Sequence, residues 1–552
     1  MTDASSLRAS SALVLVRDAA AGPEVLLLRR AERGDQNSGA WVFPGGLLDA
    51  SDGALAQVSS GRDEAGASAR LGLASGGLAW YAAAVRECFE EAGVLLAVDA
   101  QGRDVAAAAL DASWRSHVYG REQGLLQLCR EQGFTLALDR LLAFAHIVTP
   151  PGLPKRFDTR FFLAAAPAQQ PATHDGIEMT DHRWLAPALA LQGAAGVSVV
   201  GPVRRLLQRL AAFDSAGAML GWAAALGDIP CERPQRARDA AGQLIPLFPE
   251  HPGWAEARQV DPDGRGIART HVTPGEPMRL SGRVIRLTAA NPGVMTGPGT
   301  NSYLVGALGR NEWAAIDPGP ADAAHVAALR AAAPGPIRWI LVTHTHLDHS
   351  PGAALLAHAT GATVLGRRTP HASWQDTDFE PAREPRDGER LALDEGTTLR
   401  ALHTPGHASN HLCWLLEEES MLFTGDHVMQ GSTVVINPPD GDMAAYLASL
   451  RRLRDELPAL QWIAPGHGFL IGQPARVWDL LIRHREQREM KLLGALTAQP
   501  QPLDALLARV YDDVPEAKHA AARRSLLASL LKLQGEGRAQ EVMGDWRLEG
   551  NG

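Results

Sequence analysis

Cysteine is scarce in this chain of 552 residues, and long apolar runs are missing. The four cysteines lie far apart without a Cys-x-x-Cys pair, which excludes a disulfide scaffold and a cysteine-ligated zinc finger. They are Cys88, Cys129, Cys231 and Cys413. No apolar run approaches the roughly 20 residues that a membrane-spanning helix needs, and residues 1–11 have no basic segment ahead of an apolar one. We therefore expect a cytoplasmic protein with no membrane partner.

Excess positive charge is also missing. The chain has 53 Lys and Arg against 62 Asp and Glu, a net charge of −9, which excludes a protein that is basic overall. Residues 476–552 have 12 basic and 11 acidic side chains, and their only basic run is 483–491. That balance gives weak support for RNA as a partner, because a nucleic-acid module usually has a basic stripe. Apolar residues make up 45% of the chain, enough for the cores of about three domains.

The pattern along the chain predicts a multidomain α/β protein with four segments. Residues 8–226 alternate short β-like runs with Ala/Leu-rich helical stretches, and the runs at 11–18 and 24–30 are expected to pair. Within them, the Ala/Gly/Ser-rich stretch 53–77 is expected to be an exposed insertion loop. Residues 227–279 are rich in proline and predict an extended, partly ordered linker. Residues 280–475 form a second α/β domain, and 484–549 a small, mainly helical tail.

A helix predicted at residues 80–94 has a cluster of carboxylates. Glu87, Glu90 and Glu91 fall at i, i+3 and i+4, and Arg86 lies beside them. Three carboxylates so close together repel one another unless a cation lies between them, and hard divalent cations prefer such oxygen ligands. The alternative interpretation is an acidic helix face in water.

The same segment, Arg-Glu-x-x-Glu-Glu-x-Gly-Val, resembles the second half of the Nudix box, and Pro-Gly-Gly at 44–46 resembles its start. Two features depart from the family pattern: Asp52 stands where Glu is usual, and 33 residues separate it from Arg86. The long insertion resembles the branch containing the mammalian peroxisomal coenzyme A Nudix hydrolase.

This resemblance implies a Nudix α/β/α sandwich and Mg²⁺- or Mn²⁺-dependent hydrolysis of a small-molecule phosphoanhydride. The substrate would be a nucleoside diphosphate linked to another group, of the coenzyme A type by analogy with that branch. The three glutamates would bind the metal, with Glu91 catalytic, and a loop at Gly45 and Gly46 would hold the phosphates. Arg29, Arg30 and Arg33 would meet phosphate or acyl-carrier oxygens, or else are ordinary surface charges.

A second cluster of polar side chains follows a strand-like run at residues 338–343. The run ends in His344, His346, Asp348 and His349, far more imidazoles than a core needs. In an extended chain His344 and His346 point to the same side. Three further candidates follow other apolar runs or a glycine turn: His407, Asp426 and His467.

These seven residues resemble the His-x-His-x-Asp-His…His…Asp…His signature of the metallo-β-lactamase fold, an αβ/βα sandwich. By that resemblance His344, His346 and His407 bind one metal, and Asp348, His349 and His467 bind another. Asp426 would bridge the two metals, and the nucleophile would be a bridging hydroxide, with Asp348 as a catalytic residue. Two Zn²⁺ suit the imidazole-rich shell, and Mn or Fe also fits a mixed nitrogen and oxygen shell. No cysteine occupies a ligand position.

The motifs around residues 291–306 and 404–436 are similar to the β-lactamase-like protein 2 family, which adds a winged-helix-like tail. That family implies cleavage of single-stranded RNA, while a thioester substrate of the hydroxyacylglutathione hydrolase type is the alternative. The whole chain is therefore predicted to be a bifunctional hydrolase of phosphoanhydride and phosphodiester or thioester bonds. One half, more readily the Nudix half, could instead be a nucleotide-sensing binding module. The sequence gives no oligomeric state.

Overall fold

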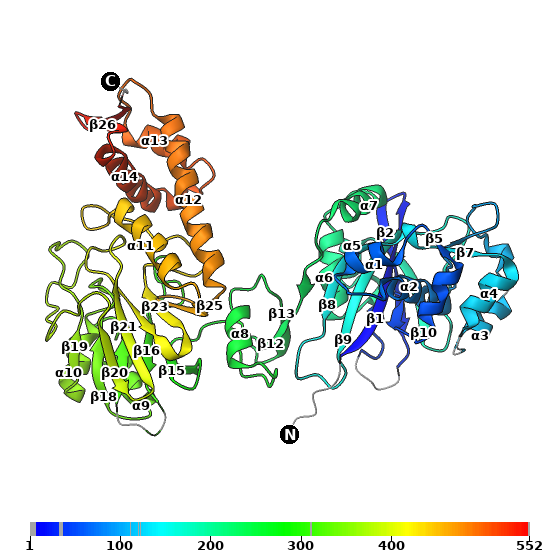
Figure 1. The fold of residues 1–552 in the computed structure, drawn as a ribbon, viewed down its shortest axis with the longest axis horizontal. Helices are drawn as coiled ribbons and strands as arrows, with labels where there is room; N and C mark the ends of the chain where they lie inside the picture. The colour runs from blue at the N-terminus through cyan, green and yellow to red at the C-terminus, as the bar shows by residue number, and fades with distance from the viewer. Residues whose placement is uncertain are drawn as a thin grey trace. The chain divides into compact units, whose positions relative to one another are not determined.

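The computed structural model describes residues 7–32, 37–110, 112–119, 121, 123–307, 309 and 312–549. The chain divides into two compact units, Met1–Arg236 and Ala237–Gly552 (Figure 1). Within the described residues, no helix is both long and apolar enough to cross a membrane. Arg33, one of the three arginines singled out above, lies outside the described ranges.

An eight-stranded mixed sheet forms the centre of the first unit, in the order β10-β2-β1-β9-β8-β11, with β3 paired to β2 and β4 to β1. Its strands are β1 (Arg8–Ala19), β2 (Gly22–Arg30), β3 (Trp41–Val42), β4 (Gly45–Leu47), β8 (Leu142–Val148), β9 (Phe157–Ala165), β10 (Met179–Leu185) and β11 (Cys231–Glu232). β1 and β2 are antiparallel neighbours joined by a tight turn at which Ala19 pairs with Gly22. The predicted pairing of these two runs is confirmed.

Helices complete the layers of this Nudix-type sandwich. They are α1 (Glu64–Leu71), α2 (Gly77–Ala92), α3 (Ala112–Val118), α4 (Gly124–Gln132), α5 (Pro187–Leu191), α6 (Gly201–Leu210) and α7 (Ala216–Ala225). The main core joins α2 to one face of the sheet through Leu13, Leu15, Tyr81, Val85 and Phe89. α7 packs on β8 and β9. The glutamate-bearing α2 is thus held rigidly by its apolar side.

The segment between Asp52 and α2 is folded, so the expectation of an exposed loop at 53–77 was wrong. It contains a 3-10 helix (Asp52–Val58), β5 (Ser59–Ser60) and α1, and β5 joins β6 (Ala97–Val98) and β7 (Thr135–Ala137) in a small sheet. Leu55 and Ala67 are buried. A Cβ atom on Gly77 would lie 2.3 Å from the backbone nitrogen of Ser68. The small residues that suggested a loop instead allow two helices to pack closely.

The proline-rich segment is ordered and contributes to both units. β11 pairs in parallel with β8 of the first unit. A hairpin of β12 (Gln235–Arg238) and β13 (Leu244–Leu247) is followed by α8 (Trp254–Val260), and a small core joins Ala237, Leu247, Ala257 and Ala268. Glu256 of α8 forms a buried ion pair with Arg286 of the second unit, 3.0 Å from Nη2 to Oε1.

Two six-stranded sheets form the centre of the second unit, and each follows chain order. The first has β14 (Met278–Arg279), β15 (Val284–Thr288), β16 (Asn301–Val305), β17 (Trp313–Ile316), β18 (Ile337–Leu341) and β19 (Thr363–Leu365). The second has β20 (Arg390–Asp394), β21 (Thr397–His403), β22 (Leu412–Leu416), β23 (Met421–Gly425), β24 (Trp462–Pro465) and β25 (Ile471–Gly472). One core lies between the sheets and others lie under the outer helices, as expected for an αβ/βα sandwich.

The outer helices of this sandwich are α9 (Ala323–Ala332) and α10 (Gly352–Thr360) on the first sheet and α11 (Met443–Glu456) on the second. α12 (Pro474–Ala495) begins in the same core through Trp478 and ends in the core of the C-terminal domain through Leu492. That domain adds α13 (Leu503–Val510), α14 (His519–Gly535), β26 (Ala539–Val542) and β27 (Asp545–Leu548) (Figure 1). One continuous helix therefore joins the sandwich to its winged-helix tail.

Candidate metal centres

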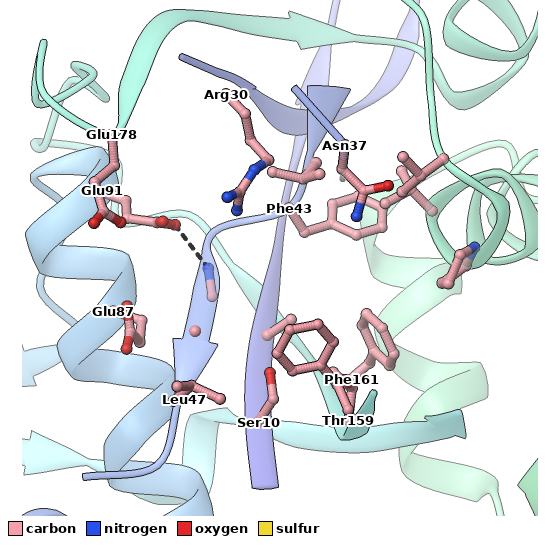
Figure 2. Close-up of a pocket in the computed structure, with 18 of the residues that line it drawn as sticks. Ser10, Arg30, Asn37, Phe43, Leu47, Glu87, Glu91, Thr159, Phe161 and Glu178 are labelled. Carbon is pink, nitrogen blue, oxygen red and sulfur yellow. Dashed lines mark hydrogen bonds between the residues drawn. The ribbon is translucent and has the colours of Figure 1, made fainter. Parts of the chain in front are cut away.

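The first candidate site is a cavity of about 630 Å³ against the polar face of α2. Glu87, Glu90 and Glu91 of α2 are among its lining residues, together with Gly45 and Gly46 of the adjacent β4. Figure 2 shows Glu87 and Glu91 on α2, facing this strand. Five of the residues singled out from the sequence are thus brought together at one cavity.

Arg86 organises the carboxylates around this cavity. Its guanidinium donates to both oxygens of Asp52, at 2.7 and 3.0 Å, to Glu87 at 2.9 Å and to Glu90 at 3.2 Å. Asp52 is fully buried. The 33-residue insertion therefore leaves the contact between the acid and the arginine intact, and the shorter Asp52 side chain is long enough to form it.

β4 approaches α2 so closely that its glycines are required. The backbone N–H of Gly45 donates to Glu91 at 2.8 Å. A Cβ atom on Gly46 would lie 2.5 Å from Oε1 of Glu87, and one on Gly45 would lie 2.5 Å from the carbonyl oxygen of Ser11. The two glycines therefore shape the carboxylate cluster, and the Gly45 N–H is already bonded to Glu91.

The carboxylates are electrostatically unsatisfied. Burial raises the pKa of Glu90 to about 7. It also raises the pKa of Glu91 well above the ordinary value for a glutamate, and the charge of Glu87 adds to that effect. A divalent cation would supply the positive charge that such a cluster lacks, so the donor set fits Mg²⁺ or Mn²⁺.

The cavity lining also includes apolar side chains and cations. The apolar residues include Phe43, Phe157, Phe161, Val200 and Val203, and the cations are Arg8, Arg30 and Lys155. Figure 2 shows Phe43 and Phe161 across the cavity from Glu87 and Glu91.

Arg29 does not line this cavity, because neighbouring residues of a strand point to opposite faces. It is partly exposed and forms an ion pair with Glu32, 2.6 Å away. Glu178, which precedes β10, does line the cavity beside Glu91 (Figure 2). The sequence held no signal for Glu178, because it is brought to α2 only by the pairing of β10 with β2.

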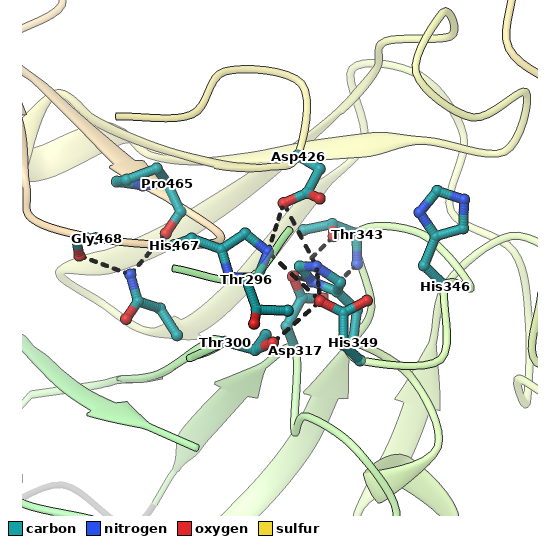
Figure 3. A network of polar contacts seen from close by, with 12 residues as sticks. Thr296, Thr300, Asp317, Thr343, His346, His349, Asp426, Pro465, His467 and Gly468 are labelled. Carbon is teal, nitrogen blue, oxygen red and sulfur yellow. Dashed lines mark hydrogen bonds and ion pairs between the residues drawn. The ribbon is translucent and has the colours of Figure 1, made fainter. Parts of the chain in front are cut away.

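The second candidate site lies where four strands of the two sheets end. His344, His346, Asp348 and His349 follow β18. His407 follows β21, Asp426 follows β23 directly, and His467 follows β24. Because all four strands end at the same edge of the sandwich, seven side chains that span over 120 residues of sequence converge there. Figure 3 shows the part of the site where His349, Asp426 and His467 lie close together.

The donor atoms form three overlapping groups in which every pair lies within 4.8 Å. The groups are His344, His346 and His407; His344, His349 and Asp426; and Asp348, His349 and His467. Nδ1 of His346 lies 2.9 Å from Nε2 of His344 and 3.1 Å from Nε2 of His407. Oδ1 of Asp426 lies 3.2 Å from Nε2 of His467 and 3.4 Å from Nε2 of His349. Donors of a tetrahedral zinc site are roughly 3.4 Å apart, so the spacing suits metal ligands.

Other groups fix the orientation of three of these rings. Nδ1 of His349 bonds to Asp317 at 2.9 Å, Nδ1 of His467 to the carbonyl of Gly299 at 3.1 Å, and Nδ1 of His407 to the carbonyl of Val435 at 2.9 Å. Nε2 is left to point into the site in each case, as in known metal sites. Asp317 also accepts from the backbone and hydroxyl of Thr343, both at 2.7 Å. The sequence had not assigned a role to Asp317.

His346 and Asp426 already have the charge states that metal binding requires. Although burial opposes it, neighbouring carboxylates raise the pKa of His349 and His467, so a metal would have to displace their protons. Burial and the neighbouring imidazole of His407 lower the pKa of His346 to about 3, so this ring is neutral. Burial opposes charge on Asp426, but the imidazoles of His467 and His349 hold its pKa well below the usual range. Among the described residues, Nε2 of His349, Nε2 of His467 and Oδ1 of Asp426 are buried and have no hydrogen-bond partner. These inward-facing atoms fit a metal centre.

Comparison with known families divides the chain in the same way. Residues 56–196 match the NUDT19 Nudix domain, residues 295–467 the metallo-beta-lactamase superfamily and residues 503–546 the beta-lactamase associated winged helix domain. The Nudix match begins after Gly45, Gly46 and Asp52, so these residues lie outside it.

Individual relatives and solved structures match parts of the chain. An atrochrysone carboxyl ACP thioesterase of Aspergillus chevalieri is 35% identical, over 50% of this chain and 89% of the relative. A beta-lactamase-like protein 2 homolog of Drosophila melanogaster is 32% identical, over 47% of this chain and 90% of the relative. The structure of a NUDIX hydrolase from Alicyclobacillus acidocaldarius aligns with 41% of this chain and 100% of its own, at 26% identity and a TM-score of 0.36.

Proposed function

Because the chain belongs to the metallo-β-lactamase superfamily and joins it to a Nudix domain and a winged-helix domain, we propose a bifunctional metal-dependent hydrolase. The Nudix site would cleave the phosphoanhydride of a nucleoside diphosphate-linked compound with Mg²⁺ or Mn²⁺. The second site would hydrolyse a thioester with two Zn²⁺, Mn²⁺ or Fe ions. The convergence of seven ligand side chains at one edge of the sandwich is the observation that carries this proposal.

In the second site we assign His344, His346 and His407 to one metal and Asp348, His349 and His467 to the other, with Asp426 between them. When bound, the metals would lower the pKa of a water molecule and supply positive charge to the substrate carbonyl. Oδ2 of Asp348 accepts a hydrogen bond from Thr300 at 3.1 Å. Asp348 is the most exposed of the carboxylate ligands, at 26% against 11% for Asp426, so it is placed to hold the proton released by water.

Exposed apolar side chains around this site favour a thioester with an apolar acyl group over RNA. Leu347 is 58% exposed and lies between two ligands, and Met295 is 53% exposed on the loop that precedes Thr300. Trp374 is 63% exposed, has a φ of 68° and adjoins Gln375, which pairs with His346. A tryptophan held exposed in the left-handed region costs about 1–3 kcal/mol, a strain typical of functional sites. Leu347 and Met295 offer no positive charge to a phosphodiester backbone, and among the described residues the one arginine that lies over this apolar surface is Arg524, 5.3 Å from the centre of the Trp374 ring.

A substrate panel separates the alternatives for this site. Long-chain acyl-pantetheine, S-lactoylglutathione and single-stranded RNA would each be offered to the full chain with Zn²⁺ or Mn²⁺, and to Trp374→Ala. We expect cleavage of the acyl-pantetheine, with a raised KM in the variant. RNA cleavage without thioester cleavage would establish the ribonuclease alternative. Preference for S-lactoylglutathione, unaffected by Trp374→Ala, would favour the hydroxyacylglutathione hydrolase type.

In the first site we assign Glu87, Glu90 and Glu91 to the metals, with Glu91 as the catalytic residue. Arg30, Arg8 and Lys155 supply positive charge along a cavity whose other lining is aromatic and aliphatic. This combination suits a pyrophosphate with a planar or acyl group beside it. The intact contact between Arg86 and Asp52 favours catalysis over a binding module, since a module that only senses a nucleotide does not need an ordered carboxylate cluster.

One class of molecule contains both of the bonds that the two sites are proposed to cleave. An acyl thioester of coenzyme A contains both a thioester and a phosphoanhydride. Water added across the thioester gives a carboxylic acid and a thiol, and water added across the phosphoanhydride gives two phosphate monoesters. Mass spectrometry of an acyl-coenzyme A digest should therefore detect the free acid and 4′-phosphopantetheine together. Tight nucleotide binding without phosphoanhydride cleavage would instead support the sensing module.

A further inference from the structure

The segment that holds His407 in place is itself held by the C-terminal domain. Residues 434–436, here called the strap, form neither helix nor strand; Val434 and Ile436 are buried, and the residue between them is half-buried. The carbonyl of Val435 in the middle of the strap accepts a hydrogen bond from Nδ1 of His407 at 2.9 Å. Buried irregular backbone needs hydrogen-bond partners outside itself.

Both ends of the strap find such partners on helices that follow the sandwich. Arg485 of α12, which is 6% exposed, donates through Nη2 to the carbonyl of Val434. Ser525 of α14 accepts at Oγ from the backbone N–H of Ile436 at 3.2 Å. The two contacts flank the carbonyl that orients His407. Ala528, one turn after Ser525, lies in the same apolar core as Val434 and Ile436.

We infer that the C-terminal helices are a structural part of the metal site formed by His344, His346 and His407: Arg485 of α12 and Ser525 of α14 position His407 by fixing the strap. This inference rests on the proposed metal assignment of His344, His346 and His407. The hydrogen bonds that orient the histidines of the other metal site do not involve the strap. His349 bonds to Asp317 and His467 bonds to Gly299, and both of these residues belong to the sandwich. The C-terminal domain should therefore affect one metal and leave the other unchanged.

Metal-binding measurements on the full chain test this inference. Metal-free protein would be titrated with Zn²⁺ against a chromophoric chelator, and the binding step that disappears in His346→Gln identifies the site of His344, His346 and His407. In Ser525→Ala and Arg485→Met we expect that step to weaken by about tenfold, at the lower end of the range for groups that support a ligand. The other step should stay within about twofold.

Ser529→Ala is the matched control. Ser529 lies one turn further along α14, is equally buried, and donates to the carbonyl of Ser525 without touching the strap. Its Zn²⁺ titration should equal that of the parent. Ser525→Ala keeps the helix, so it remains informative if Arg485→Met fails to fold. Circular dichroism would verify the fold of each variant.

The outcomes separate this inference from the proposed function. If the parent protein binds no Zn²⁺ or Mn²⁺, the proposed metal centre fails. If the parent binds two metals and folded Ser525→Ala binds both with unchanged affinity, the strap inference is overturned. Equal weakening of both steps would also overturn it, because that pattern indicates a general loss of stability.

Discussion

The carboxylate site of the first unit draws its three glutamates from one helix, whereas the site of the second unit draws seven side chains from the ends of four strands. In the first, Arg86 lies among the carboxylates and the donors are all oxygen. In the second, imidazoles predominate, and the rings of His349, His407 and His467 are each oriented by a carboxylate or a carbonyl. Oxygen donors suit a hard cation bound together with substrate phosphates, and an oriented imidazole shell suits a resident transition metal.

This difference predicts that the second site retains metal on purification and the first does not. Asp426→Ala gives the largest expected effect, because the carboxylate lies between both donor groups. We expect loss of both metals by elemental analysis and a fall in thioesterase activity on the order of 10³-fold or more. Phosphoanhydride cleavage should be unchanged.

The control for this variant is Asp322→Ala, which removes the N-cap of α9 in the same domain. It should cost about 1 kcal/mol of stability and no metal. An Asp426→Ala protein that still binds two metals per chain would contradict the bridging assignment.

The position at which the chain is cut between the units should decide the stability of the second unit. A second-unit fragment that starts at residue 270 lacks Glu256 and leaves Arg286 as a buried charge without its partner. Breaking such a pair costs about 3–5 kcal/mol. We therefore expect the fragment 237–552 to fold and bind metal, and the fragment 270–552 to be far less stable in urea unfolding. Equal stability of the two fragments would show that α8 is dispensable.

The sequence predicts a site well where its residues lie close together along the chain, and less well where distant segments form it. The spacing of Glu87, Glu90 and Glu91 places them together on any helix, so local pattern was sufficient. The His344 to His349 motif was equally local, but its union with His407, Asp426 and His467 depends on strand order and came from the family resemblance. Glu178 and Asp317 had no local signal. The pairing of β10 with β2 brings Glu178 to its site, and the fold brings Asp317 to His349, which is 32 residues away in sequence.

Composition misled at residues 53–77, and at residues 227–279 it did not indicate which part is ordered. Residues 53–77 are rich in Ala, Gly and Ser, yet Gly77 is small because α1 packs against it. Residues 227–279 are rich in proline, yet Glu256 is buried against Arg286. Stretches rich in glycine, alanine or proline indicate loops only where no other element packs closely against them. A sequence alone does not show which elements pack together.

Charge removal at Glu91 tests whether the first site is catalytic. Glu91→Gln removes one negative charge, while its amide oxygen can still accept from the N–H of Gly45. We expect kcat for phosphoanhydride cleavage to fall on the order of 10²-fold, with a smaller change in KM, because metal charge matters most in the transition state. Thioesterase activity of the same sample is the internal control. Unchanged kcat would favour the sensing module.

The smallest expected effect compares two neighbouring arginines of β2. Arg30 lines the cavity of the first site, and Arg29 points away from it toward Glu32. Arg30→Ala should raise KM for the phosphoanhydride about tenfold, the effect of one charge-assisted contact, and leave kcat nearly unchanged. Arg29→Ala should change KM by less than about twofold, although it removes the same charge from the adjacent position. Because the two variants alter net charge equally, a similar rise in KM for both would mean that general electrostatic attraction, and not a contact inside the cavity, binds the substrate.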